Sequence, residues 1–512
     1  MTDIKTKPET MENIHRRISS SMDLRSLARQ EGAYAKDRGN IRMSSLCSDS
    51  RRVTPGAAFF ALPGLRTHGN EHLREAIERG ARVVITDSET DTLPSHVVKV
   101  KVDDARTALA KFSKRYHGNP DELLKLIGIT GTNGKTTVTS LTRHLLEEPG
   151  RPVGLIGTVK YHLGDRELPS YRTTPEASDL YPLLKSMLVG GCSEAVMEVS
   201  SHGIHQSRVA GLQLEIAAFL NLSRDHLDYH KTMEAYFKEK RKIFNGVNGS
   251  LPQVAVVNGD CPYGKRLLDE LPPQVRFISF GFEEGCLFRA IQISLDANGA
   301  KFVLESPAGN IVVNSPLVGR YNIMNVLASF AIIYGMGRSV PDAVQKLAGF
   351  NGVDGRMEVI DQGQVFKVVV DYAHTPDALR NALGMLRECT KGKLHLVFGC
   401  GGDRDRGKRL EMTRVACAGA DRIWATADNP RTEPQSSIFD DMKKGVSRGA
   451  KVAFIEDRRR AINRAFDAAG PEDCVLIAGK GHEAFQEIQY SAIPFDDRRI
   501  AEDLIQAKIF SH

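Results

Sequence analysis

The stretch "LLKLIGITGTNGKTT", residues 123–137, predicts a buried strand, a glycine-rich loop and the start of a helix. The apolar run 123–130 has the length of a buried parallel strand. After the loop, Val138, Leu141 and Leu145 recur at helical spacing. A strand, a glycine-rich turn and a helix in this order are typical of a parallel α/β sheet with a phosphate site at the carboxyl end of the strand.

The glycine-rich loop carries residue types that bind a triphosphate. Its glycines let backbone N–H groups point at phosphate, Lys135 can reach the β- and γ-oxygens, and the hydroxyl of Thr136 can bind Mg²⁺. The strict phosphate-loop pattern has a glycine where Ile129 stands, so a tight turn that carries Gly-Lys-Thr by chance is the alternative. The predicted ATP contacts in the loop are Gly131, Thr132, Asn133, Gly134, Lys135, Thr136 and Thr137.

The length of the chain predicts more than one domain. A chain of 512 residues is too long for one core, and about 100–200 residues per domain gives roughly three domains. We expect domains over residues 1–122, 123–349 and 350–512. The third segment alternates strands and helices without a phosphate loop of its own. The predicted fold class is therefore α/β, with a central parallel sheet of the P-loop ATPase type and a C-terminal Rossmann-like domain.

Short apolar runs mark further strands, and most of them end in a polar cluster. The start of one helix is readable, because Thr375 can cap it, Pro376 fits the first helical position and Asp377 meets the positive end of the dipole. The predicted strands lie within residues 57–62, 81–86, 194–200, 217–223, 253–259, 366–372, 394–399, 422–427, 451–456 and 474–481.

Composition excludes several classes of protein. A net charge of +6 is small for this length, and the basic run "KEKRK" (238–242) has no interleaved aromatic residue, so we expect a solvated helix face and no nucleic-acid partner. The eight cysteines have no paired spacing, which favours a reducing compartment. The N-terminus lacks the apolar run of a signal peptide, and no stretch approaches the roughly 18 apolar residues of a membrane span. The sequence predicts a cytoplasmic protein.

Two polar clusters follow strands of the second segment. In "MEVSSHG" (197–203), Glu198 near a buried strand end needs a partner, either a metal ion beside ATP or an arginine in the core. In "NLSRDHLDYH" (221–230), His226 and His230 have the i,i+4 spacing of a zinc helix but lack the internal Glu of a metalloprotease. Because these strand ends should converge with the phosphate loop, we favour a single imidazole that completes a Mg²⁺ site.

The third segment places five motifs mostly after predicted strands. They are "GRMEV" (355–359), "DYAHTPDAL" (371–379), "GCGGDRDRGKR" (399–409), "DNPR" (428–431) and "GKGHE" (479–483). Their cationic groups could bind a carboxylate and their anionic groups an ammonium, which predicts a pocket for a zwitterion. The residues of this pocket would be Arg404, Arg431, Lys480, Asp428, Asn429 and Glu483.

In this order, the motifs resemble those of the Mur ligase family over essentially the whole chain, from the "SDSR" loop (48–51) onward. The resemblance implies an N-terminal domain for a UDP-linked substrate, a central ATPase domain and a C-terminal domain that brings an amino acid. It also implies the reaction: ATP phosphorylates the γ-carboxylate of D-glutamate in UDP-MurNAc-L-Ala-D-Glu, and an amine attacks the acyl phosphate, in the synthesis of a peptidoglycan precursor. Mg²⁺ would be the metal, and a monomer is expected.

The resemblance also assigns roles to matching positions. Lys240 in "YFKEKRKIF" would be carbamylated and, with Thr136, Glu198 and His226, would serve the metal, while Lys135 would act on the phosphates. The "DNPR" motif goes with meso-diaminopimelate, because Arg431 can pair with a distal carboxylate that lysine lacks. The remaining assignments are Asn322, Asn325, Arg356 and Asp371 for ATP; Ser50, Thr173, Thr174, Ser200, Gln206 and Arg208 for the UDP substrate; and Arg404, Asp428, Asn429, Pro430, Arg431, Gly479 and Glu483 for the amino acid.

Two rival interpretations stay open at the level of sequence. One is another ATP-dependent ligase of the same superfamily, such as a folylpolyglutamate synthetase, against which the "DNPR" and "SDSR" loops argue. The other is a mechanical or switch P-loop NTPase, which should show an apolar run ending in an acidic pair; none lies near the loop. Within the resemblance, "GLRTHG" (64–69) lacks the His-Gln of some relatives, and Arg172 stands where some have Asn.

Overall fold

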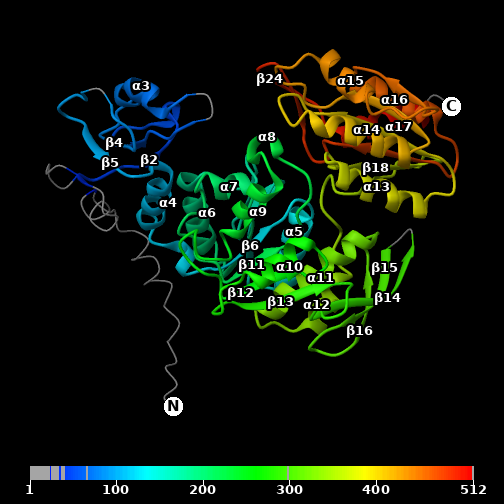
Figure 1. Ribbon diagram of the computed structural model, residues 1–512, viewed down its shortest axis with the longest axis horizontal. Coiled ribbons are helices and arrows are strands. Elements are labelled where there is room, and N and C mark those ends of the chain that lie inside the picture. The colour runs from blue at the N-terminus through cyan, green and yellow to red at the C-terminus, as the bar shows by residue number, and fades with distance from the viewer. Residues whose placement is uncertain are drawn as a thin grey trace.

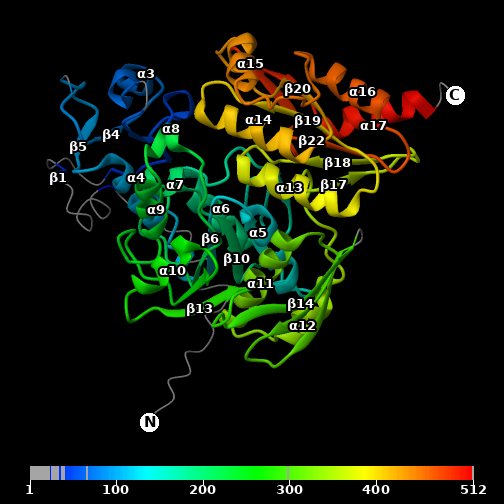
Figure 2. The same cartoon turned by 45° about the vertical axis from the view of Figure 1, so that its right-hand side comes forward.

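The computed structural model describes residues 24, 34–35, 41–64, 67–90, 92–296 and 299–509. The described strands form three large sheets that follow one another along the chain, and a two-stranded hairpin. Figure 1 shows the first unit in blue, the central unit in cyan and green, and the third unit in yellow to red. In both Figure 1 and Figure 2 the third unit lies above the central sheet.

The first unit contains a five-stranded sheet in the order β1-β5-β4-β3-β2, in which only β1 is antiparallel to its neighbour. The predicted strands 57–62 and 81–86 are confirmed as β3 and β4. Helix α4 packs against α6 of the central unit. The elements are β1 (Tyr34–Ala35), β2 (Leu46–Cys47), η1 (Ser50–Arg52), β3 (Ala58–Phe60), η2 (Gly69–His72), α3 (Leu73–Glu78), β4 (Val83–Thr86), β5 (Val98–Lys101), α4 (Ala105–Tyr116) and η3 (Pro120–Glu122).

The central unit contains an eleven-stranded sheet with β6 (Lys125–Thr130) in its middle, between β10 (Glu194–Glu198) and β11 (Ile216–Phe219). The parallel sheet predicted from sequence is confirmed for the middle strands, which pair in parallel. Antiparallel strands extend both edges and were not predicted. The other strands are β7 (Val153–Ile156), β8 (Lys160–His162), β9 (Glu167–Pro169), β12 (Val254–Asn258), β13 (Arg276–Gly281), β14 (Phe288–Asp296), β15 (Gly299–Glu305) and β16 (Ile311–Ser315).

Helices cover both faces of this sheet, so its strands are apolar on both sides. Ile127 and Ile129 of β6 pack in one core with α5, α11 and α12. Leu126 of the same strand packs in a second core with α6 and α9. The alternation follows from the two-residue period of a strand. The helices are α5 (Lys135–Leu146), α6 (Ala177–Val189), α7 (Ser201–His205), α8 (Leu227–His230), α9 (Met233–Arg241), α10 (Pro262–Asp269), α11 (Arg320–Gly335) and α12 (Val340–Leu347).

The third unit is a six-stranded sheet in the order β17-β18-β22-β19-β20-β21, parallel except for β17. Helices α13–α15 cover one face and α16–α17 the other. Thr375 caps α13 as predicted, because its Oγ1 accepts the Ala378 N–H at 3.2 Å. The elements are β17 (Glu358–Ile360), β18 (Lys367–Asp371), α13 (Pro376–Cys389), β19 (Leu394–Cys400), α14 (Gly407–Gly419), β20 (Arg422–Ala427), α15 (Gln435–Lys443), β21 (Val452–Phe454), α16 (Arg458–Ala468), β22 (Cys474–Ala478), β23 (Phe485–Ile488), β24 (Ser491–Pro494) and α17 (Asp497–Ile509).

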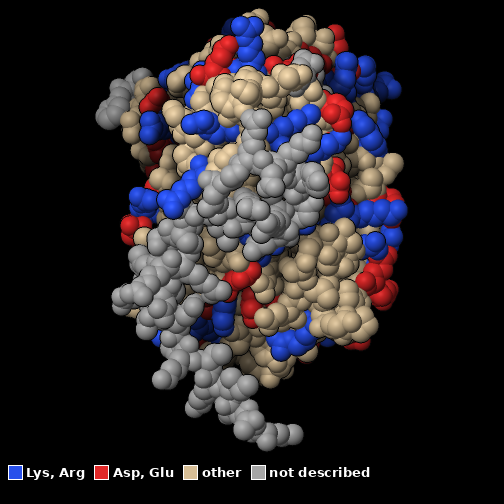
Figure 3. All heavy atoms as spheres, turned by 90° about the vertical axis from the view of Figure 1, so that its left-hand side faces the viewer, with Lys and Arg blue, Asp and Glu red and all other residues tan. Residues whose placement is uncertain are grey.

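One prediction about the surface is wrong. The run 238–242 was expected to form a solvated helix face, yet Lys240 on α9 is only 1% exposed. On the face shown in Figure 3, Lys and Arg are interspersed with Asp and Glu. All eight cysteines lie in the described residues and are free thiols. Among the helices that the structure describes, none is long and apolar enough to cross a membrane.

Candidate active site

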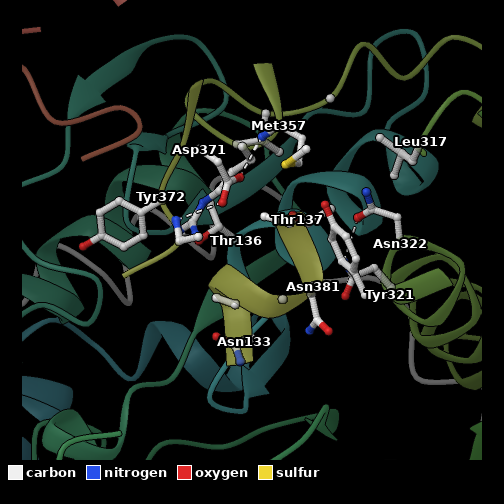
Figure 4. A pocket seen from close by; sticks show the side chains of 18 of the residues that line it. Asn133, Thr136, Thr137, Leu317, Tyr321, Asn322, Met357, Asp371, Tyr372 and Asn381 are labelled. Carbon is white, nitrogen blue, oxygen red and sulfur yellow. Dashed lines mark hydrogen bonds between the residues drawn. The ribbon is translucent and has the colours of Figure 1, made fainter. Parts of the chain in front are cut away.

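A cavity of about 930 Å³ lies between the central and third units. Its walls come from the phosphate loop, from helix α11, from the segment 348–357 that connects the two units, and from the end of β18 with helix α13. In Figure 4, Tyr321 and Tyr372 lie on opposite sides of Thr136. The predicted residues that line the cavity are Thr132, Asn133, Gly134, Lys135, Thr136, Thr137, Thr173, Glu198, Ser200, His226, Asn322, Asn325, Arg356 and Asp371.

The phosphate loop has the tight backbone that close approach to phosphate needs. Gly134 has φ of +88°, a left-handed conformation that glycine tolerates best, and a Cβ at this position would lie 2.5 Å from Oδ1 of Asn325. Lys135 donates from Nζ to the carbonyl oxygens of Gly131 and Thr132, both at 2.9 Å. Burial lowers the pKa of Lys135. The loop therefore fits a triphosphate, whose oxygens would replace the backbone carbonyls as partners of this ammonium.

Glu198 lies at the end of β10 and is fully buried. Its Oε1 accepts from the Thr158 N–H at 2.7 Å, and its Oε2 accepts from the hydroxyls of Thr158 at 3.0 Å and Thr136 at 3.2 Å. Its partners in the described part of the chain are thus hydroxyls and one amide, and the arginine bridge that was the alternative is not among them. A carboxylate beside a hydroxyl is an oxygen donor set that suits Mg²⁺.

Arg356 connects the third unit to the phosphate loop. Its Nη2 donates to Oγ1 of Thr136 at 3.0 Å, and its guanidinium lies 4.4 Å from the ring centre of Tyr372. Asp371, at the end of β18, accepts the Met357 N–H at 2.8 Å and so holds the segment that carries Arg356. Burial raises the pKa of Asp371.

A second contact between the two units centres on Asp225, which was not predicted. Its carboxylate lies 3.4 Å from Nε2 of His226, 4.0 Å from Nε2 of His374 and 3.9 Å from Nζ of Lys408. Burial lowers the pKa of His226 well below its ordinary value, which keeps the imidazole neutral and able to bind a metal. His230 instead pairs with Oγ of Ser201 at 3.0 Å. Among the described residues, no three or more His, Cys, Asp or Glu side chains are grouped so that they could hold a metal ion.

Lys240 is buried directly behind the phosphate loop. Its Nζ donates to the carbonyl oxygen of Gly131 at 2.9 Å and to Oγ1 of Thr130 at 3.2 Å, and it lies 4.8 Å from the ring centre of Tyr236. Burial and the charge of Lys135 hold the pKa of Lys240 well below its ordinary value. Burial therefore favours the neutral, nucleophilic form of the amine.

Most residues assigned to the UDP substrate form a network beside Glu198. Thr174 donates to the Glu198 carbonyl oxygen at 2.9 Å, Arg208 donates to the Thr174 carbonyl oxygen at 2.8 Å, and Gln206 accepts from Arg208 at 2.5 Å. Thr173 and Ser200 line the cavity. Ser50 lies apart in the first unit, where its hydroxyl donates to Glu75 at 2.6 Å.

The residues assigned to the amino acid do not line the cavity and form a separate cluster at strand ends of the third unit. Lys480 donates from Nζ to Oδ1 of Asn429 at 3.0 Å and lies 3.1 Å from Oε2 of Glu483. Burial raises the pKa of Glu483. Gly479 has φ of +116°, and a Cβ there would lie 2.6 Å from Oδ2 of Asp428, so the two motifs approach closely.

Two arginines flank Gly401 in this cluster. A Cβ at Gly401 would lie 3.1 Å from Nη1 of Arg431 and 3.7 Å from Cγ of Arg404. Arg431 pairs through Nε with Glu487 at 2.7 Å and donates from Nη1 to the Gly402 carbonyl oxygen at 2.9 Å. The side chains of both arginines that were predicted to bind carboxylates therefore pass beside Gly401.

Some cavity residues were missed by sequence reasoning. Tyr372 and His374 belong to the motif "DYAHTPDAL", of which only Asp371 was assigned to ATP. Tyr321 directly precedes the predicted Asn322, and Asn381 lies one turn beyond the start of α13. The signal for Tyr372 and His374 was their position after a strand. Tyr321 and Asn381 lie on helices, and the sequence did not indicate which helix faces the site.

The fold and the cavity define a class. A phosphate loop faces a second α/β unit, with a buried acid beside the loop threonine and a cluster of both charges in the second unit. This arrangement fits a nucleotide-dependent enzyme that joins two substrates.

Comparisons with known proteins define the family. Three family models match the chain: "Mur ligase family, catalytic domain" over 42–117, "Mur ligase middle domain" over 129–333 and "Mur ligase, glutamate ligase domain" over 355–481. A UDP-N-acetylmuramoyl-L-alanyl-D-glutamate--2,6-diaminopimelate ligase of Geobacillus thermodenitrificans is 40% identical over 487 residues, 94% of this chain and 99% of the relative. The chain belongs to the Mur ligase family, as its motifs predicted, and it is an ATP-dependent ligase.

Solved structures agree with this assignment. The structure of a UDP-N-acetylmuramoyl-L-alanyl-D-glutamate--2,6-diaminopimelate ligase is 34% identical with a TM-score of 0.66, and the match covers 96% of this chain and 100% of that one. A Mycobacterium tuberculosis folylpolyglutamate synthase complexed with ADP and AMPPCP is 18% identical with a TM-score of 0.60, covering 73% of this chain and 93% of that one. The second likeness concerns the fold alone.

Proposed function

We propose that this ligase adds meso-diaminopimelate to the D-glutamate of UDP-MurNAc-L-Ala-D-Glu. The observation that carries the proposal is the single cavity in which the phosphate loop, Glu198 and groups of the third unit, Arg356 among them, meet. The specific substrates are supported by the names of relatives about 40% identical over nearly the whole chain.

The chemistry explains why ATP is needed. A carboxylate is a poor electrophile, because its oxygen is a poor leaving group. Transfer of the γ-phosphoryl group to that oxygen gives ADP and an acyl phosphate. The amine of the incoming amino acid then attacks the acyl carbon, the C–N bond forms, the C–O bond to phosphate breaks, and the amine loses a proton. The products are an amide, ADP and inorganic phosphate.

The residues of this chain have separate tasks in the proposed reaction. Lys135 would stabilise the charge on the β- and γ-oxygens, and Arg356 would approach the same phosphates from the third unit. Thr136, Glu198 and His226 would hold Mg²⁺, together with a carbamylated Lys240. The ion, when bound, would neutralise the developing charge on the transferred group.

Phosphate release tests this function directly. Because the proposed transfer needs an acceptor carboxylate and its completion needs an amine, phosphate release from ATP should require both the UDP-dipeptide and diaminopimelate. A coupled phosphate assay with each substrate omitted in turn measures this. Equal release with ATP alone would favour a switch NTPase instead. A panel of diaminopimelate, L-lysine, L-ornithine and glutamate would identify the amino acid.

Replacing Arg431 by alanine tests the choice of amino acid. The second carboxylate of diaminopimelate would lose a charge-assisted partner, so its KM should rise about 10- to 100-fold. The KM values for ATP and the UDP-dipeptide should stay unchanged, because Arg431 lies outside the cavity. Steady-state kinetics with each substrate varied measure the effect. Unchanged dependence on diaminopimelate would remove Arg431 from the pocket.

We also propose that the enzyme acts as a monomer in the cytoplasm. Its proposed substrates are a nucleotide-linked dipeptide and a free amino acid, and its free thiols, of which Cys47, Cys192, Cys261, Cys400 and Cys474 are buried, suit a reducing compartment.

A further inference from the structure

A buried ion pair lies beneath the cluster that holds Arg404 and Arg431. Arg409, on α14, has a fully buried side chain. Its Nη1 and Nη2 donate to the two carboxylate oxygens of Glu433 at 2.8 Å and 2.6 Å. The same Nη2 donates to the Gly401 carbonyl oxygen at 3.2 Å. The pair therefore joins the loop after β19 to the loop after β20.

Further hydrogen bonds bind these two loops to each other. Oε2 of Glu433 accepts the Asp403 N–H at 3.2 Å. In turn, Oδ2 of Asp403 accepts from the Thr432 N–H at 3.1 Å and from the Thr432 hydroxyl at 2.8 Å. The loops also touch through backbone, since a Cβ at Gly402 would lie 1.9 Å from the Pro430 carbonyl oxygen. In the chain, Arg404 directly follows Asp403, and Arg431 directly precedes Thr432.

We propose that Arg409 and Glu433 are positioning residues that fix the spacing between Arg404 and Arg431 and thereby set the selectivity for the incoming amino acid. The inference rests on the proposed function only for the identity of that amino acid. The side chain of Arg409 is fully buried, so its effect on the amino acid would pass through the two loops. Two arginines held at a fixed spacing match carboxylates at a fixed spacing, and a shorter or singly charged amino acid loses one of the contacts.

The charge of Glu433 is required by its geometry. Its two oxygens accept from three donors, which are both guanidinium nitrogens of Arg409 and the N–H of Asp403. Hydrogen bonds from Arg409 lower the pKa of Glu433, so it is ionised at neutral pH. A glutamine at this position has one oxygen and an NH₂ group, which would face a donor. With its NH₂ at the Oε1 position, the glutamine loses one of the two bonds from Arg409; with its NH₂ at the Oε2 position, it loses the other bond from Arg409 and the bond from the Asp403 N–H.

Asp441 provides a matched control. It accepts from Nη1 of the same Arg409 at 3.1 Å, from Nε of Arg406 at 2.9 Å and from Nζ of Lys444 at 2.7 Å. Arg406 lies at the helix end of the loop after β19, but none of these bonds reaches the loop after β20, so they do not join the two loops. Asp441→Asn thus changes the same charge next to the same arginine. If the ion pair only stabilises the unit, Glu433→Gln and Asp441→Asn should behave alike.

Kinetics with competing amino acids test the proposal. In Glu433→Gln, the KM for diaminopimelate should rise about 10-fold and the preference for diaminopimelate over L-lysine should narrow, while the KM for ATP stays unchanged. Asp441→Asn should leave the KM for diaminopimelate, the preference for diaminopimelate over L-lysine and the KM for ATP unchanged. Thr432→Val, at an exposed position, removes one bond between the loops and should act in the same direction as Glu433→Gln, but more weakly. Equal effects of Glu433→Gln and Asp441→Asn on selectivity would overturn the proposal.

Hydrogen exchange separates this inference from the proposed function. Amide exchange of peptides that cover 401–406 and 428–433 should be faster in Glu433→Gln than in the wild type. In Asp441→Asn the exchange of 428–433 should be unchanged, because the bond from Arg406 to Asp441 lies in the other loop. This measurement needs no substrate. If the enzyme uses no amino acid of the panel, the proposed function is wrong. Hydrogen exchange would still test whether Arg409 and Glu433 hold the two loops together. Unchanged exchange in Glu433→Gln would overturn the positioning role even in a fully active enzyme.

Discussion

Replacing Lys240 by alanine is expected to lower kcat by about 10³-fold or more, with little change in the melting temperature. The neutral amine is a nucleophile for CO₂: the nitrogen would form a bond to its carbon and lose a proton, which gives an anionic carbamate. The Lys240 amine donates to the Gly131 carbonyl oxygen at 2.9 Å. The carbamate would instead provide an oxygen ligand for Mg²⁺ behind the phosphate loop. Single-turnover and steady-state assays in bicarbonate buffer measure the loss.

Rescue distinguishes a lost carboxylate from a lost amine. Added acetate or formate should restore part of the activity of Lys240→Ala, because a small carboxylate can occupy the vacated space. Lys238→Ala is the control, since Lys238 lies on the same helix with a side chain that is 61% exposed and should be dispensable. Full activity of Lys240→Ala without additive would end the carbamate hypothesis.

Glu198→Gln is expected to lower kcat by about 10²- to 10³-fold while the protein without ligands keeps or gains stability. The amide keeps the size of the side chain but loses the charge that would bind Mg²⁺. It also removes a buried carboxylate whose partners, Thr136 and Thr158, carry no positive charge. The concentration of Mg²⁺ needed for half-maximal rate should rise. Activity assays across a Mg²⁺ series and thermal melting measure the two effects.

The opposite end of the same strand supplies the control. Glu194 is also buried, but it pairs with Arg338 at 2.8 Å and lies far along β10 from the cavity. Glu194→Gln should lower the melting temperature, because it leaves the arginine unpaired, and should leave kcat unchanged. If both variants lose stability and activity in parallel, Glu198 has a structural task only.

Most of the parallel strands could be predicted because each is a short apolar run with its own polar ending. Each of the eleven predicted runs contains one strand, from β3 to β22, but the parallel strands β2, β5, β7 and β13 lie outside these runs and were not predicted. The antiparallel strands β14, β15 and β16 were missed, because they alternate apolar and polar residues along one exposed edge and carry no motif. The domain boundaries at 122 and 349 stay predictions.

Within the site, sequence identified the residues that follow strands and missed what depends on packing. The burial of Lys240 could not be deduced from its basic neighbours, since only the fold of α9 against the loop decides which lysine points inward. Asp225 was not predicted, because its contact with Lys408 joins residues 183 positions apart in the chain. The roles assigned to the site residues stay predictions until the variants are measured.

The segment 348–357 is both the covalent link between two units and part of the wall of the cavity. A ligand that fills this cavity contacts the connecting segment. The affinity for that ligand and the angle between the two units are therefore coupled. An inhibitor shaped against this wall would lock the joint at one angle, and a pair of fluorophores placed across the joint would report nucleotide occupancy without any chemistry taking place.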